Sequence, residues 1–174
     1  MKETLCEERH FHQTYSTHEI KVRNFLFYKL GDLEKAKDLT QEAFIRLWNN
    51  CSDVAIEKAK SFLFTTANRL FLDYYDHQKV VLKFEHRTDK TESRMELNPE
   101  FLYQGEEFKQ KLEAAISGLP EKQRVIFLMS RIDKHKNREI AEVLDLSIKT
   151  VEKHMSSALK TLKENLDELK NYKV

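Results

Sequence analysis

The chain has 174 residues, with 30 Lys and Arg against 29 Asp and Glu, so its formal net charge is +1. An apolar fraction of 40% and 11 Phe provide enough material for a folded core and exclude general disorder. With 3 Gly, 2 Pro and no β-branched runs beside hairpin turns, the chain is predicted to be all-α.

The sequence also bears on the compartment. No apolar run approaches the roughly 20 residues that span a bilayer, and the N-terminus lacks an apolar signal-peptide core, so a cytoplasmic protein is expected. Cys6 and Cys51 stand alone, and we expect two separate thiols in a reducing compartment. His10, His12 and His18 match no standard ligand spacing, so a solvated helix start is expected and no metal site.

Helical apolar spacing divides the chain into two parts. Three helices are expected in the first part, near Phe11–Leu30, Glu34–Trp48 and Glu57–His77. A polar stretch with Pro99 and Gly105 follows and is typical of a linker. We therefore predict two small helical domains joined by a linker, with the bounds 1–84, 85–106 and 107–174.

The second expected helix carries an unusual outer face. Its inward stripe contains Leu39, Ala43 and Leu47, widened by Phe44 and Trp48. An apolar residue among acids and an amide indicates a partner surface. The alternative is a plain amphipathic helix whose acids only solvate it. The outer residues are Asp38, Gln41, Glu42 and Ile45.

The third expected helix also has two faces. Its inward residues are Leu63, Phe64, Ala67, Leu70, Phe71 and Tyr74, and its outward residues are Thr65, Arg69, Asp73 and Asp76. Two outward carboxylates would repel phosphate, so any contact of this helix with a nucleic acid would have to come from Asn68, Arg69 and Lys79. An enzyme that uses Asp73, Asp76 and His77 is disfavoured, because three groups so close on one helix cannot surround a substrate.

The segment from Asn137 to Leu166 predicts a helix-turn-helix. Ile140, Ala141 and Leu144 have helical spacing before a short break, and Ser147 is well placed to cap the helix that follows. Upstream, Pro120 suits the first turn of another helix. The apolar seam of the last helix comprises Val151, Met155, Ala158, Leu162 and Leu166.

The face opposite that seam is basic. With Val151 at zero, Lys149, Lys153, Ser156 and Lys160 lie at about 140° to 200°. Residues 119–174 have a net charge of +3, after −2 over residues 80–118 and zero over residues 1–79. These groups suit phosphates and base edges in a major groove, although outer lysines are often merely solvated. The full set of predicted DNA-binding residues here is Arg138, Ser147, Lys149, Thr150, Lys153, Ser156, Ser157 and Lys160.

Three motifs carry a family resemblance. The pattern "LPEKQRVIFLM…NREIAEVLDLSIKTVEKHMSSALKTL" resembles the last domain of bacterial sigma factors, and LuxR-type regulators share a similar helix-turn-helix. "KAKDLTQEAFIRLW" resembles the sigma-factor segment that grips core RNA polymerase, and "SFLFTTANRLFLDYYDHQK" resembles the next helix, which faces the upstream promoter element. In this order the motifs resemble a two-domain sigma factor of the extracytoplasmic-function (ECF) group of the sigma-70 family.

The resemblance implies a function and partners. It implies promoter-specific transcription initiation through core RNA polymerase and the −35 and −10 promoter elements, with an anti-sigma factor as a further partner. The resemblance implies that Asp38, Gln41 and Glu42 bind the polymerase, and we add Ile45 to this surface. The resemblance also implies that the loop with Asn49, Asn50 and Ser52 captures an unstacked base of the melted promoter.

Neither catalytic residues nor a cofactor is implied, and the chain lacks the P-loop pattern GxxxxGK[ST]. The protein is therefore not expected to be an enzyme. A LuxR-like regulator remains the alternative, although it accounts for residues 119–174 alone. The sequence departs from the family at Asp76, where an arginine is common, and at Asp145, where glycine is common. Because Asp tolerates positive φ, we expect the turn to survive.

Overall fold

A computed structural model describes the backbone of residues 4–84 and 106–171, and the side chains of residues 4–76 and 110–165. Over these ranges the structure contains α-helices, one short 3₁₀ helix and no strand, which confirms the predicted all-α class. The chain divides into two compact units, Met1–Ser93 and Arg94–Val174. The expected linker, 85–106, lies outside the described residues apart from Glu106, which begins a helix.

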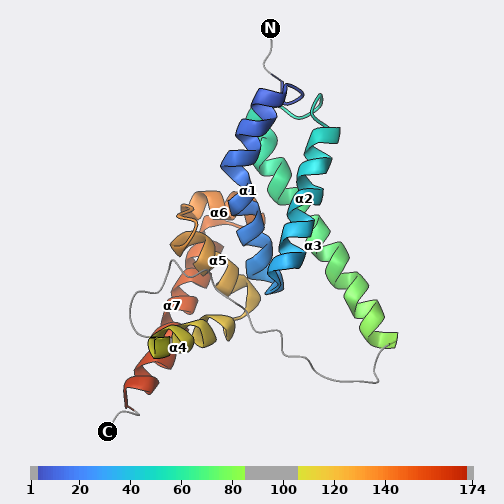
Figure 1. Cartoon of the computed structure of the whole chain (residues 1–174). Coiled ribbons are helices and arrows are strands. Elements are labelled where there is room, and N and C mark those ends of the chain that lie inside the picture. The colour runs from blue at the N-terminus through green and yellow to red at the C-terminus, as the bar shows by residue number, and fades with distance from the viewer. Residues whose placement is uncertain (1–3, 85–105, 172–174) are drawn as a thin grey trace. The chain divides into compact units, whose positions relative to one another are not determined.

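The first unit is a three-helix bundle. It consists of α1 (Glu8–Leu30), α2 (Leu33–Asn49), the 3₁₀ helix η1 (Ile56–Lys58) and α3 (Ala59–Phe84). Each of the three α-helices packs against the other two (Figure 1). The core is formed by their apolar faces, and its largest fully buried side chains are Phe25, Phe64, Leu5, Leu26, Leu47, Leu63 and Val22.

A two-residue connection sets the direction of α2. Gly31 has φ 70°, a conformation that costs glycine little, and its N–H donates to Phe27 O at 2.8 Å to end α1. Asp32 then caps α2 by accepting a hydrogen bond from Lys35 N at 3.0 Å. So tight a turn makes α1 and α2 antiparallel, so the start of α1 lies beside the end of α2.

The second unit is built around its last helix. It contains α4 (Glu106–Ser117), α5 (Glu121–Arg131), α6 (Asn137–Leu144) and α7 (Ile148–Asn171). Helix α7 packs against each of the other three. Pro120 directly precedes α5, one position before the expected first turn. The fully buried side chains at the centre of this unit are Ile116, Ile126, Leu128, Met129, Ile140 and Val151.

Two helices of the first unit are longer than expected. Helix α1 begins at Glu8, three residues before Phe11, and α3 continues to Phe84, seven residues beyond His77. Neither extension contains Gly or Pro, so nothing in the local sequence stops the helix. Across the described ranges, no helix has an apolar stretch long enough to cross a membrane.

Candidate functional site

The predicted partner surface lies on the solvent side of α2. Asp38 and Gln41 are exposed, Glu42 is half-buried, and Ile45 is 54% exposed. The spacing of these four residues places them on one helical face. Glu42 Oε1 accepts a hydrogen bond from Arg46 Nε at 2.8 Å, which orients the carboxylate along the helix.

The opposite side of α2 is inward, as predicted for Leu39, Ala43, Phe44 and Leu47. Trp48 differs from the prediction, because its side chain is 44% exposed. Its ring packs edge-on against Phe11 of α1, with 4.9 Å between centroids. Tyr15 of α1, also exposed, packs against Phe44 with 4.7 Å between ring centroids and the two rings tilted by 54°. An aromatic rim therefore extends from α2 onto α1, and the sequence motif of α2 alone gave no signal for the residues from α1.

The loop after α2 borders a hollow of about 560 Å³, which is lined by Thr4 together with residues 51–57. Asn49, the last residue of α2, is exposed, as are Asn50 and Ser52 after it. Asn50 is already engaged by its own helix, because its Nδ2 donates to Arg46 O at 2.7 Å. Among the three predicted base-contacting residues, Ser52 lines the hollow.

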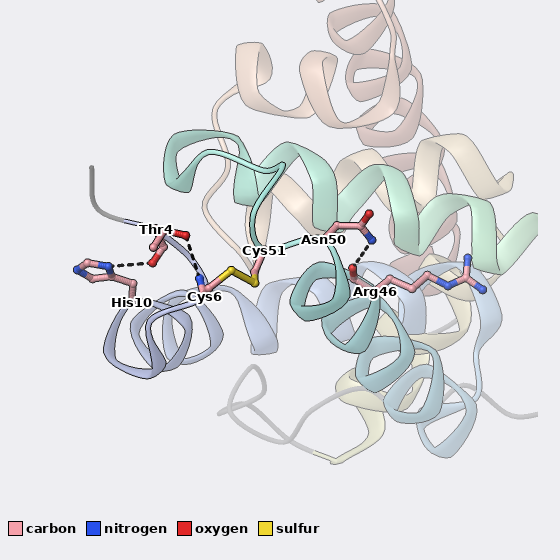
Figure 2. The surroundings of a disulfide bond; sticks show 6 residues. All are labelled: Thr4, Cys6, His10, Arg46, Asn50 and Cys51. Carbon is pink, nitrogen blue, oxygen red and sulfur yellow. Dashed lines mark hydrogen bonds between the residues drawn. A yellow bond between two sulfur atoms is a disulfide. The ribbon is translucent and has the colours of Figure 1, made fainter. Parts of the chain in front are cut away.

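The two cysteines form a disulfide, so the expectation of separate thiols was wrong. Cys6 precedes α1 and Cys51 follows α2, and their Cα atoms are 5.0 Å apart across the bond (Figure 2). The antiparallel arrangement of α1 and α2 brings these two positions together despite a separation of 45 residues. Because the two cysteines are bonded to each other, they give no support for a reducing compartment.

The histidines near the N-terminus are not uniformly solvated. His10 is 7% exposed, and its Nδ1 lies 3.1 Å from Thr4 O, so the expectation of a solvated helix start was wrong there. His12 is exposed and His18 is half-buried. Burial lowers the pKa of His18, and the positive charges of Lys60 and Lys21 lower it further. In the part of the chain that the structure describes, no cluster of His, Cys, Asp or Glu could hold a metal ion.

The predicted DNA contacts on α3 differ in their exposure to solvent. Arg69 is exposed, next to exposed Asp73 and Asp76. Asn68 is half-buried, and its Oδ1 accepts a hydrogen bond from Lys29 Nζ of α1 at 2.7 Å. The side chain of Lys79 lies outside the described residues, as does that of His77.

The inward residues of α3 follow the prediction. Leu63, Phe64, Ala67, Leu70 and Phe71 are buried. Tyr74, at the end of this stripe, is half-buried.

The turn between α6 and α7 has the predicted geometry. Asp145 ends α6 in the left-handed region, with φ 53°. Leu146 N then donates to Ala141 O at 2.9 Å, which closes the end of the helix. Ser147 caps α7, because its Oγ accepts a hydrogen bond from Thr150 N at 3.1 Å.

Helix α7 separates an apolar side from a basic side. Val151, Ala158 and Leu162 are buried and Met155 is half-buried, whereas the side chain of Leu166 lies outside the described residues. Lys160 Nζ is 3.9 Å from Glu164 Oε1, a weak contact between exposed groups. Thr150 and Ser157 are half-buried at the edge of the basic side. The exposed members of the predicted set are Arg138, Ser147, Lys149, Lys153, Ser156 and Lys160.

Two family models match the chain. Sigma-70 region 2 matches residues 14–80, which include α2 and most of α3. Sigma-70 region 4 matches residues 109–162, which include the turn between α6 and α7. A LuxR-like regulator would explain the second match alone, so that alternative is not favoured.

Characterised relatives point to the same family. The chain is 28% identical to the ferric citrate uptake sigma factor FecI of Escherichia coli K12 over 149 residues, which cover 86% of each chain. It is 25% identical to the ECF RNA polymerase sigma factor SigW of Bacillus subtilis 168, over 86% of this chain and 84% of the relative.

Solved structures share the fold. The sigma factor RpoE of Bartonella quintana, solved in complex with the anti-sigma factor NepR, matches with a TM-score of 0.73 and 19% identity, over 90% of this chain and 96% of that chain. CnrH, solved with the cytosolic domain of CnrY, matches with a TM-score of 0.63 and 18% identity, over 93% and 90%. Sigma-70 regions 2 and 4 follow each other along the chain in that order, and the relatives and the fold agree with this match. The chain therefore belongs to the sigma-70 family and is an RNA polymerase sigma factor of the ECF group.

Proposed function

We propose that this sigma factor binds core RNA polymerase through the outward face of α2 and reads promoter DNA through α7 and the loop after α2. The observation that carries the proposal is the exposed basic face of α7, which begins at a capped turn and is opposite a buried seam. In this arrangement the helix can enter a major groove while its apolar side stays packed.

The polymerase contact rests on the α2 face. Ile45 is more than half exposed, yet it lies among Asp38, Gln41 and Glu42. An apolar side chain in water gains free energy when a partner covers it, and the surrounding acids favour a basic partner surface. The aromatic rim that includes Trp48 enlarges the apolar area available to that partner.

The −35 element would be read by α7. Lys149, Lys153 and Lys160 can neutralise phosphates, and Ser156 can donate to or accept from a base edge. The N–H groups at the start of α7 add a phosphate site near Ser147. Arg138 of α6, also exposed, lies in the helix that precedes the turn.

The −10 element would be held by the first unit. Ser52 and Asn49 can bond an unstacked base at the loop, and Arg69 can contact the backbone. Asn50 and Asn68 make weaker candidates, because their amide groups bond Arg46 O and Lys29 Nζ within the bundle. Binding energy spent on single-stranded bases would melt the duplex, so no catalytic residue or cofactor is required.

A regulatory partner and a compartment complete the proposal. Both solved structures described above are complexes, one with an anti-sigma factor and one with the cytosolic domain of CnrY. We infer that an anti-sigma factor also binds this chain, and that the chain works in the cytoplasm with polymerase. Such a partner would cover the α2 face or the α7 face and keep the free sigma factor inactive.

Co-elution with core RNA polymerase on a sizing column, without DNA, tests the proposal. The wild-type chain should co-elute, and the variant with Asp38→Ala and Gln41→Ala should bind roughly tenfold more weakly. The matched control changes an exposed acid and an exposed amide elsewhere, Asp73→Ala and Gln13→Ala, and should bind normally. If the wild-type chain does not co-elute, or both variants bind normally, the α2 surface is not the polymerase contact.

A further inference from the structure

The hollow beside the loop has two walls from distant parts of the chain. Thr4 belongs to the segment before α1, and residues 51–57 belong to the segment after α2. The disulfide between Cys6 and Cys51 joins these two segments (Figure 2), and Cys51 itself lines the hollow. The bond therefore fixes one wall against the other.

Each wall is otherwise held by hydrogen bonds to its own helix end. On one side, Thr4 O accepts from Glu7 N at 3.3 Å and from His10 Nδ1 at 3.1 Å. Within the same segment, Cys6 N donates to Thr4 Oγ1 at 3.2 Å. These bonds keep the first wall on α1.

On the other side, Cys51 N donates to Trp48 O at 3.1 Å, and Val54 N donates to Asn50 O at 3.1 Å. These bonds keep the second wall on α2. Because the hydrogen bonds on each side are local, opening the disulfide would leave both helix ends formed and would remove the covalent link between the two walls.

The bond is accessible and its reversal is compatible with the fold. Cys6 is exposed and Cys51 is half-buried, so small thiols and disulfides can reach the sulfur atoms. Leu5, beside Cys6, is 0% exposed and anchors the segment in the core whatever the state of the bond. The two thiols would therefore stay near each other after reduction, and the bond could form again.

We propose that Cys6 and Cys51 form a reversible redox modification site whose disulfide form holds the hollow in the shape that accepts a single-stranded promoter base. The inference rests on the proposed function of the loop. A wall fixed before binding loses less conformational entropy on binding, so the disulfide form initiates transcription more strongly than the dithiol form.

The reaction partner is a low-molecular-weight disulfide in one direction and a dithiol in the other. On oxidation, one cysteine thiolate attacks the small disulfide, releases one small thiol and forms a mixed disulfide. The second cysteine thiolate attacks that bond, which releases the second small thiol and closes the protein disulfide. The protein loses two protons and two electrons, and the small disulfide takes them up as its two thiols.

Run-off transcription tests the inference with the full chain bound to core polymerase. Glutathione disulfide and dithiothreitol set the two states, intact-mass measurement verifies the state of the chain, and host genomic DNA fragments serve as the template. We expect roughly three- to tenfold more specific transcripts from the disulfide form. Polymerase co-elution should be equal in both states, because the α2 face is unchanged.

Two variants act as controls. Cys6→Ser and Cys51→Ser should each give the low transcript level in both reagents, with normal helix content by circular dichroism. Equal transcription by both states of the wild-type chain would overturn the inference, as would two free thiols after treatment with glutathione disulfide. A response of Cys6→Ser equal to that of the wild type would also overturn it, because the polymerase would then be the sensitive component. If neither state transcribes, the proposed function fails, and this inference fails with it.

Discussion

The ammonium group of Lys29 on α1 donates a hydrogen bond of 2.7 Å to Asn68 Oδ1 on α3. The same ammonium group lies 4.3 Å from the centroid of the Phe71 ring. Lys29 therefore joins two helices of the bundle through a charged hydrogen bond and a cation–π contact. The amide of Asn68, a predicted DNA contact, therefore accepts a hydrogen bond in the contact between α1 and α3.

Asn68→Ala should lower the free energy of unfolding of the first unit by about 1–2 kcal/mol, because the hydrogen bond from Lys29 Nζ to Asn68 Oδ1 is lost in a partly buried site. Urea unfolding followed by circular dichroism measures this change. Arg69→Ala is the neighbouring control and should leave the unfolding midpoint unchanged while it weakens promoter binding. The reverse pattern would mean that Asn68 is the DNA contact of this pair.

Lys153→Ala should weaken promoter binding and lower the salt dependence by about one phosphate contact, because the exposed ammonium on α7 neutralises one phosphate. Binding of a labelled promoter fragment at several salt concentrations gives both quantities. Lys122→Ala, which changes an exposed lysine at the start of α5, should behave as the wild type. An equal loss in both variants would indicate a general charge effect with no special role for α7.

Asp145→Val should destabilise the second unit by about 1–2 kcal/mol, because φ 53° is strained for a β-branched residue. Asp145→Gly should leave the stability equal or slightly higher, since glycine adopts this conformation freely. Thermal unfolding of both variants compares them directly. If Asp145→Val is as stable as the wild type, the turn does not depend on the left-handed conformation.

The stability of the first unit should fall as the pH drops below 6.5, partly because of His18. Burial lowers the pKa of this side chain in the folded state, so below its ordinary value of 6.5 the unfolded chain binds the proton more readily than the folded chain does. Protonation therefore favours unfolding. The positive charges of Lys60 and Lys21 also lower this pKa and add to the effect. The difference in urea midpoint between about pH 7.5 and about pH 5.5 should be smaller in His18→Gln. An unchanged difference would show that other groups dominate.

Much of the fold was predictable from the sequence. Apolar spacing predicted α2 to within one residue at each end, and the Asp145 turn and the Ser147 cap were both confirmed. These features depend on interactions within a few residues of the chain, so the local sequence contains the information needed to predict them.

The errors came from contacts between distant segments. His10 is buried because Thr4 accepts a hydrogen bond from its ring, and that segment precedes the helix. The outward position of Trp48 and its contact with Phe11 depend on how α1 lies along α2. The disulfide depends on the same pairing, which spacing between two isolated cysteines cannot indicate. The engagement of Asn68 by Lys29 required the packing of α1 against α3.

The exposed position of Trp48 has a practical consequence for every experiment on this protein. It is the one tryptophan in the sequence, so the indole emission of the purified chain comes from a single place. That place is three residues from Ile45 on one side and from Cys51 on the other, and Trp48 O accepts the hydrogen bond from Cys51 N. Polymerase covering the α2 face would shift the emission to shorter wavelength, and a change at the neighbouring sulfur atoms would alter its intensity. The chain thus carries its own optical reporter between its proposed polymerase surface and its redox site, and no added label is needed to follow opening of the disulfide in the purified chain.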